Sequence, residues 1–150
     1  MTKNKVADIK IITDTREQLP YGFRTLDTIV KTLDTGDYSL TNHENCISVE
    51  RKSFPDWIGS ITQGRERFER ELKRAERFKT FYIVIESDLK KMWKGTRYSK
   101  ANMTSVINTS IAYMEKFPHV KVIYASTRGQ ARYLVENLFK FHAKYCEEEQ

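Results

Sequence analysis

The segment CISVERK, residues 46–52, alternates apolar and polar side chains, and this pattern strongly constrains the local fold. In a β-strand, successive side chains point to opposite faces, so Ile47 and Val49 would lie on one face. Ser48, Glu50 and Lys52 would then lie on the other. The pattern predicts a strand that presents a carboxylate and an ammonium group side by side.

Further strands alternate with helices along the chain. Short β-branched or apolar runs predict strands over residues 8–14, 81–86 and 120–125, and the turn at 35–37 makes Asp37 open another strand. Helical periodicity and capping signals predict helices from Ser53 to near Gly64, over 65–78, over 102–117 and over 127–145, with a loop and partial helix over 90–100 and a frayed tail over 146–150. This order predicts an α/β fold with a mixed central sheet flanked by helices.

Size and charge narrow the class of protein. A chain of 150 residues is long enough for one domain with one core, and a net charge of +6 favours a polyanionic partner without establishing one. The sequence has neither a membrane-spanning apolar run nor a secretory signal, which predicts an intracellular protein of the cytoplasm or nucleoid that is not secreted and contacts no membrane. Cys46 and Cys146 lack a zinc-binding or disulfide pattern, so two buried or inert thiols are expected.

The charged residues at strand ends suggest a chemistry. Asp37 and Glu50 could hold a hard cation such as Mg²⁺ through oxygen ligands, and the cation would lower the pKa of a bound water. Lys52, on the same face as Glu50, could orient or deprotonate that water and contact a phosphate. The alternative is an ordinary surface ion pair between Glu50 and Lys52, without function.

A longer string of motifs favours the catalytic interpretation. Gly36-Asp37 is followed after twelve residues by Glu50-Arg51-Lys52 and then by Asp56. This string resembles the G-D, variable gap, E-R-K-x-x-x-D signature of the nuclease domain of XPF-type structure-specific endonucleases. The family's upstream D-x-R-E matches residues 14–17, and its downstream segment matches Ile58-Gly59-Ser60 followed by Gly64-Arg65.

The resemblance implies a restriction-endonuclease-like (PD-(D/E)XK) core that uses Mg²⁺ or Mn²⁺ to cut branched DNA such as flaps, forks and junctions, in repair, recombination or replication. The roles it implies are metal binding by Asp37, Glu50 and Asp14, catalysis by Lys52, and a supporting site of Arg16, Glu17, Arg51 and Arg65. Arg51 would act through its backbone carbonyl, Arg65 would touch phosphate, and Glu17 would steer basic partners or bind a second ion. Asp56 is expected in the outer shell, or merely as an acid stabilised by a helix dipole.

The same resemblance raises the question of how DNA is gripped. Members of the family commonly carry a tandem helix-hairpin-helix domain, whereas residues 1–150 are predicted to form a single nuclease domain without one. The basic segment over residues 90–100, which also holds Trp93, could follow a DNA backbone and stack on a base, or it could be a solvated loop. The candidate DNA-binding residues are Lys90, Lys91, Lys94, Arg97, Tyr98 and Lys100.

Family members also pair through their C-terminal helices, which predicts a homodimer. One stripe of the last helix is expected to enter the core, namely Ala131, Leu134, Val135, Leu138, His142 and Tyr145. Tyr133, Phe139 and Phe141 would remain for a partner, although a neighbouring loop could cover them instead. Two other functions stay open, which are a catalytically idle DNA-binding or scaffolding subunit and a junction resolvase or nickase of the wider restriction-like superfamily.

Overall fold

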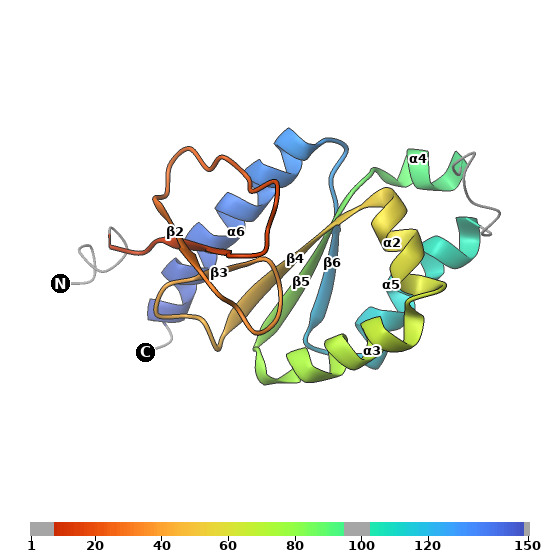
Figure 1. Cartoon of the computed structure of the whole chain (residues 1–150), viewed down its shortest axis with the longest axis horizontal. Coiled ribbons are helices and arrows are strands. Elements are labelled where there is room, and N and C mark those ends of the chain that lie inside the picture. The colour runs from red at the N-terminus through yellow and green to blue at the C-terminus, as the bar shows by residue number, and fades with distance from the viewer. Residues whose placement is uncertain (1–7, 95–102, 149–150) are drawn as a thin grey trace.

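The central element is a mixed sheet, as predicted, and it has six strands among the described residues. The computed structural model describes residues 8–94 and 103–148 (Figure 1). The strands are β1 (Ile11–Asp14), β2 (Thr28–Lys31), β3 (Tyr38–Leu40), β4 (Ile47–Ser53), β5 (Thr80–Glu86) and β6 (Val120–Tyr124), in the spatial order β2-β1-β3-β4-β5-β6. β3 runs antiparallel to β1 and β4, whereas the other neighbouring pairs are parallel.

Helices cover both faces of this sheet (Figure 1). They are α2 (Phe54–Ile61), α3 (Arg65–Arg74), a 3₁₀ turn (Ala75–Arg77), α4 (Leu89–Lys94), α5 (Met103–Lys116) and α6 (Arg128–Glu148). Phe81, Ile83 and Ile85 of β5 are buried with residues of α2, α3 and α5, while Val84 is buried with residues of α6. The period of two along β5 therefore divides the core into two layers. Within the described ranges, no helix is long and apolar enough to span a membrane.

β2 is a strand that the sequence pattern did not predict. Among the described residues it pairs with β1 alone, at the edge of the sheet, and all but one of its residues are exposed, Val30 to 71%. A strand with so little burial carries no alternation of apolar and polar residues. Only the pairing with β1 identifies it.

The buried stripe of α6 differs from the prediction. Ala131, Val135, Phe139 and Ala143 are buried, so Phe139 belongs to the core rather than to a free surface. Tyr145, expected in the core, is 53% exposed. The helix also continues to Glu148, beyond the predicted end at residue 145. Ala131 and Val135 are buried as predicted, and the stripe continues from them at a spacing of four residues through Phe139 and Ala143.

A buried glutamate attaches α6 to the segment that precedes β2. The Glu136 carboxylate accepts hydrogen bonds from the backbone N–H groups of Arg24, Thr25 and Leu26 at 2.9, 2.8 and 3.1 Å, and from Arg132 at 3.0 Å. Burial alone would raise the pKa of Glu136, but the backbone hydrogen bonds outweigh it and hold the pKa below its usual value. Glu136 thus fixes residues 24–26 against the helix.

Candidate active site

A tight turn delivers Asp37 to the sheet. The Asp37 N–H donates to the Val49 carbonyl at 2.8 Å, and the Asp14 N–H donates to the Asp37 carbonyl at 2.8 Å. The preceding residue, Gly36, has a φ of +88°, a conformation that residues with a Cβ rarely adopt. A Cβ on Gly36 would also lie 2.0 Å from the Ser48 Oγ. The glycine of the Gly-Asp motif is therefore required by the backbone conformation of the turn.

Replacing Gly36 by alanine is expected to lower the free energy of unfolding by about 2–3 kcal/mol, because the strained φ and the contact with Ser48 both oppose the native turn. Urea denaturation followed by circular dichroism measures the change. Gly22 is the matched control, since a Cβ there meets nothing within 4 Å. Equal stability of Gly36→Ala and Gly22→Ala would contradict this account of the turn.

β4 presents Glu50 and Lys52 on the same face, as predicted. The Lys52 Nζ lies 3.7 Å from the Glu50 Oε1 and 5.0 Å from the centroid of the Phe68 ring. The backbone N–H of Arg51, between them, donates to the Asp37 Oδ2 at 2.8 Å. This bond joins the carboxylate of Asp37 directly to the strand that carries Glu50 and Lys52.

The surroundings of Asp37 and Glu50 raise the pKa of both carboxyl groups. Burial raises the pKa of Asp37 to about 6, and the charge of Glu17 adds to the increase, although the Arg51 N–H and Lys52 oppose it. Burial also raises the pKa of Glu50 well above its usual value, and the charges of Asp37 and Glu71 act in the same direction. Both shifts are those of carboxylates that lack enough positive charge nearby.

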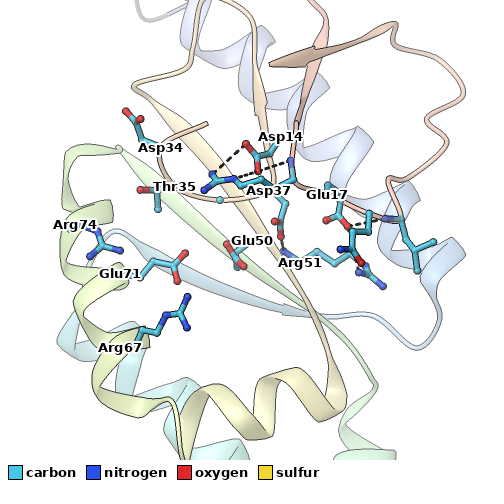
Figure 2. Close-up of a pocket in the computed structure, with 14 residues that line it drawn as sticks. Asp14, Glu17, Asp34, Thr35, Asp37, Glu50, Arg51, Arg67, Glu71 and Arg74 are labelled. Carbon is cyan, nitrogen blue, oxygen red and sulfur yellow. Dashed lines mark hydrogen bonds and ion pairs between the residues drawn. The ribbon is translucent and has the colours of Figure 1, made fainter. Parts of the chain in front are cut away.

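Asp37 and Glu50 open onto a cleft, shown in Figure 2 and called the main cleft here. It is lined by Asp14, Arg16, Glu17, Gln18, Leu19, Asp34, Thr35, Gly36, Asp37, Glu50, Arg51, Arg67, Glu71 and Arg74. An adjoining side cleft is lined by Glu50, Lys52, Pro55, Asp56, Gly59, Ser60, Gly64, Arg67, Phe68 and Glu71. Glu50, Arg67 and Glu71 line both clefts, so they stand where the two meet.

The side chain of Arg51 points away from Glu50 and Lys52, as the strand period predicts. Its Nη2 lies 2.6 Å from the Glu86 Oε1, and its Nη1 lies 4.0 Å from the Glu17 Oε1. Tyr21 donates its hydroxyl to Glu86 at 3.1 Å. Glu17 therefore reaches this ion-pair group while it also raises the pKa of Asp37.

Asp14 holds Arg16 at the edge of the main cleft. Its Oδ2 accepts from the Arg16 Nε at 2.9 Å, and its Oδ1 accepts from the Leu33 N–H at 2.8 Å. Burial would raise the pKa of Asp14, but these hydrogen bonds hold it below its usual value. Both carboxylate oxygens thus have protein donors, which distinguishes Asp14 from Asp37 and Glu50.

Helix α3 supplies cleft residues that the sequence interpretation missed. Arg67, Glu71 and Arg74 are spaced by four and three residues on one face of α3 and point into the main cleft (Figure 2). Arg65, the predicted phosphate contact, is not among the residues that line either cleft. Its Nε lies 3.8 Å from the Glu69 Oε2, and its guanidinium lies 6.0 Å from the Tyr113 ring centroid.

The remaining predicted residues divide between the clefts and other surfaces. Asp56 lines the side cleft, and its backbone N–H donates to Ser53, the predicted N-cap of α2, at 3.2 Å. Lys90 and Lys91 are exposed on α4, and neither is among the described residues that line the clefts. Lys94 ends α4, while Arg97, Tyr98 and Lys100 lie outside the described residues.

Comparison with known proteins identifies the family. The model of the ERCC4 domain matches residues 13–138. XPF from Aeropyrum pernix superposes with a TM-score of 0.71 at 21% identity, over 89% of this chain and 61% of that chain. XPF from Aeropyrum pernix in complex with DNA gives 0.71 and 21%, over 90% and 65%. The present chain therefore spans less than two thirds of the length of those proteins.

Among curated proteins, none matches the sequence significantly. The solved structures support the fold, with a mixed six-stranded sheet and flanking helices as in the XPF nuclease domain. The family match covers most of the chain and includes Asp37, Glu50 and Lys52. This chain belongs to the ERCC4 domain family of XPF-type nucleases.

Proposed function

We propose that this protein is a DNA endonuclease that requires Mg²⁺ or Mn²⁺ and hydrolyses phosphodiester bonds at the junction of the two clefts. The observation that carries the proposal is the pair of carboxylates, Asp37 and Glu50, whose pKa values burial raises even though the charge of Lys52 opposes the increase in both. Burying two such carboxylates lowers the stability of the fold, and acids with strongly raised pKa values cluster at functional sites.

The donor set fits a hard divalent cation. Asp37 and Glu50 offer carboxylate oxygens, the ligand type that Mg²⁺ and Mn²⁺ prefer, and the Arg51 carbonyl lies between Glu50 and Lys52 in the chain. Burial and the charges of nearby acids raise both pKa values, and a cation held there would offset both effects. When bound, it supplies a water of lowered pKa and charge stabilisation at the scissile phosphate.

The other side chains have roles that their positions support. Lys52 orients the attacking water and contacts the phosphate, since its Nζ is held beside Glu50. Arg16, Arg67 and Arg74 bind the flanking phosphates from opposite walls of the main cleft. Asp14 positions Arg16 through its hydrogen bond to the guanidinium, and Glu71 helps to raise the pKa of Glu50 by its charge and its side-chain hydrogen bond.

Divalent cations are expected to raise the melting temperature of the protein above pH 7 and to have little effect at pH 5. The pKa of Asp37 is about 6 and that of Glu50 is also raised, so both acids must lose protons to bind a cation, and protonation competes as the pH falls. Thermal melts with and without Mn²⁺ from pH 5 to pH 8 test this. An equal shift at both ends of the range would exclude these acids as ligands.

We also infer that the substrate is branched DNA, as in the family the chain belongs to. Labelled flap, fork, four-way junction and linear duplex DNA, each with Mg²⁺, Mn²⁺ or EDTA, test activity and substrate together. Preferential cutting of flaps and forks supports the inference, whereas preference for four-way junctions favours a resolvase. If the protein binds DNA but cuts none of the substrates under any of these conditions, the result would indicate an idle scaffolding subunit and contradict the proposal.

A homodimer through α6 is the proposed assembly. Tyr133, Phe141 and Tyr145 are 59%, 55% and 53% exposed, and their spacing of eight and four residues places them on one ridge of the helix. Tyr133→Ser with Phe141→Ser is expected to shift a dimer toward monomer in sedimentation velocity. Substitution of exposed Ile111 of α5 to serine is the control. Wild-type protein that sediments as a monomer at high concentration would contradict the proposal.

A further inference from the structure

Two histidines and a cysteine meet where the loop after β3 contacts the C-terminal part of α6. One ligand atom from each of His43, His142 and Cys146 can be chosen so that all three lie within 4.8 Å of one another. The Cys146 Sγ lies 3.4 Å from the His142 Nε2, and the rings of His43 and His142 pack edge to face with centroids 5.1 Å apart. All three residues are partly buried.

The fold brings these residues together from distant parts of the sequence. His142 and Cys146 are one turn apart on α6, so they project from the same side of the helix. His43 belongs to the turn between β3 and β4, where its carbonyl accepts from the N–H groups of Cys46 and Ile47 at 2.9 and 3.1 Å. The backbone at His43 is therefore held in place, and the three side chains converge from two ordered elements.

The chemistry of this group differs from that of the clefts. Imidazole and thiolate are ligands that Zn²⁺ prefers, whereas Mg²⁺ takes oxygen ligands. Around a tetrahedral zinc ion the Zn–N and Zn–S bonds are about 2.0 and 2.3 Å, so neighbouring ligand atoms lie roughly 3.5 Å apart. The 3.4 Å separation of Cys146 and His142 already matches this value. A ring nitrogen of His43 completes the set, whose ligand atoms all lie within 4.8 Å of one another.

We propose that His43, His142 and Cys146 form a second metal site, which binds Zn²⁺ with water as a fourth ligand. The site is separate in residues and ligand type from the acids of the main cleft. A bound zinc ion links the β3–β4 turn to the last turns of α6 and stabilises the end of that helix. Under this proposal Cys146 is a ligand rather than one of the two inert thiols expected from the sequence, and its companion histidine stands four residues earlier.

Cobalt(II) is the probe, because a thiolate ligand produces a charge-transfer absorption band that carboxylate ligands do not. Metal-free, reduced protein is titrated with Co²⁺ and then with Zn²⁺. The expected result is a saturable band at one equivalent that Zn²⁺ displaces. Asp37→Asn removes a ligand of the proposed catalytic site and should leave the band unchanged. The zinc site and the catalytic site are thus tested independently of one another.

Three variants complete the experiment. Cys146→Ser should abolish the band, and His43→Gln should lower Co²⁺ affinity at least about tenfold. Cys46→Ser is the matched control, because its sulfur is not part of the cluster, and it should retain the band. Circular dichroism and the melting temperature without metal show whether each variant folds. Absence of the band in folded wild-type protein, or its persistence in Cys146→Ser, would overturn the proposal.

Discussion

Replacing Asp37 by asparagine is expected to lower the rate of metal-dependent DNA cleavage by about 10³-fold or more while making the metal-free protein more stable at pH 8. The loss of activity follows from the loss of a carboxylate ligand, since a catalytic cation contributes several kcal/mol of transition-state stabilisation. The hydrogen bond from the Arg51 N–H to the side-chain oxygen can be kept by the amide, so the local structure should survive.

The gain in stability follows from the direction of the pKa shift. The folded-state pKa of Asp37 is about 6, above its ordinary value of 3.8, so the folded state favours the protonated form. The stability that the protonated Asp37 contributes to the folded state is fully present below about pH 4 and is lost as the pH rises through 6. At pH 8 the ionised carboxylate therefore costs on the order of 1–3 kcal/mol, and asparagine removes that cost.

Single-turnover cleavage of a preferred DNA substrate and urea denaturation at pH 8, both on the same preparation, test these two effects. Asp27→Asn is the control, because this aspartate is exposed before β2 and lies outside the residues that line the clefts. Full activity in Asp37→Asn would remove Asp37 from the catalytic mechanism. Lost activity with lowered stability would instead indicate a damaged fold.

Glu136→Ala is expected to lower the free energy of unfolding by about 3–5 kcal/mol, although Glu136 takes no part in the proposed chemistry. The change would leave three backbone N–H groups of residues 24–26 without their acceptor and Arg132 without its carboxylate. Glu136→Gln, which keeps an acceptor oxygen but no charge, should cost less. Urea denaturation measures both changes.

The pH dependence provides an independent check on Glu136. The folded-state pKa of Glu136 lies below the ordinary value of 4.5. The ionised carboxylate therefore contributes its full stability to the fold above pH 4.5, and this contribution is lost as the pH falls through the folded-state pKa. The difference in stability between wild type and Glu136→Ala should therefore shrink in acid. Glu115→Ala on the exposed face of α5 is the control. Similar stability of the two alanine variants would contradict the anchoring role.

The parts of the fold predicted from sequence are those where local pattern and tertiary burial agree. The alternation of β4 places Glu50 and Lys52 on one face and Arg51 on the other, because register along a strand leaves no other choice. The Gly36-Asp37 pair is likewise visible in sequence, since only glycine fits the turn. The family signature reflects these local requirements.

The features that were missed depend on how elements dock. α3 carries arginine and glutamate on several faces, and only the burial of Phe68 and Leu72 shows that Arg67 and Glu71 enter the cleft while Arg65 does not. Each of these two cleft residues directly precedes a buried apolar residue, which is the signal that could have identified them. In α6, similarly, docking of the helix buries Phe139, which the periodicity left outside the predicted stripe.

The antiparallel pairing of β3 with β4 explains which distances in the motif can vary during evolution. Asp37 and Glu50 are brought together by the pairing of Tyr38 with Val49, and the turn over residues 41–46 lies at the far end of that hairpin. Added or deleted residues in the turn would lengthen or shorten a surface loop and leave the two acids in place. A single insertion between Glu50 and Lys52 would instead exchange the faces of the strand, so the E-R-K spacing admits no change in length.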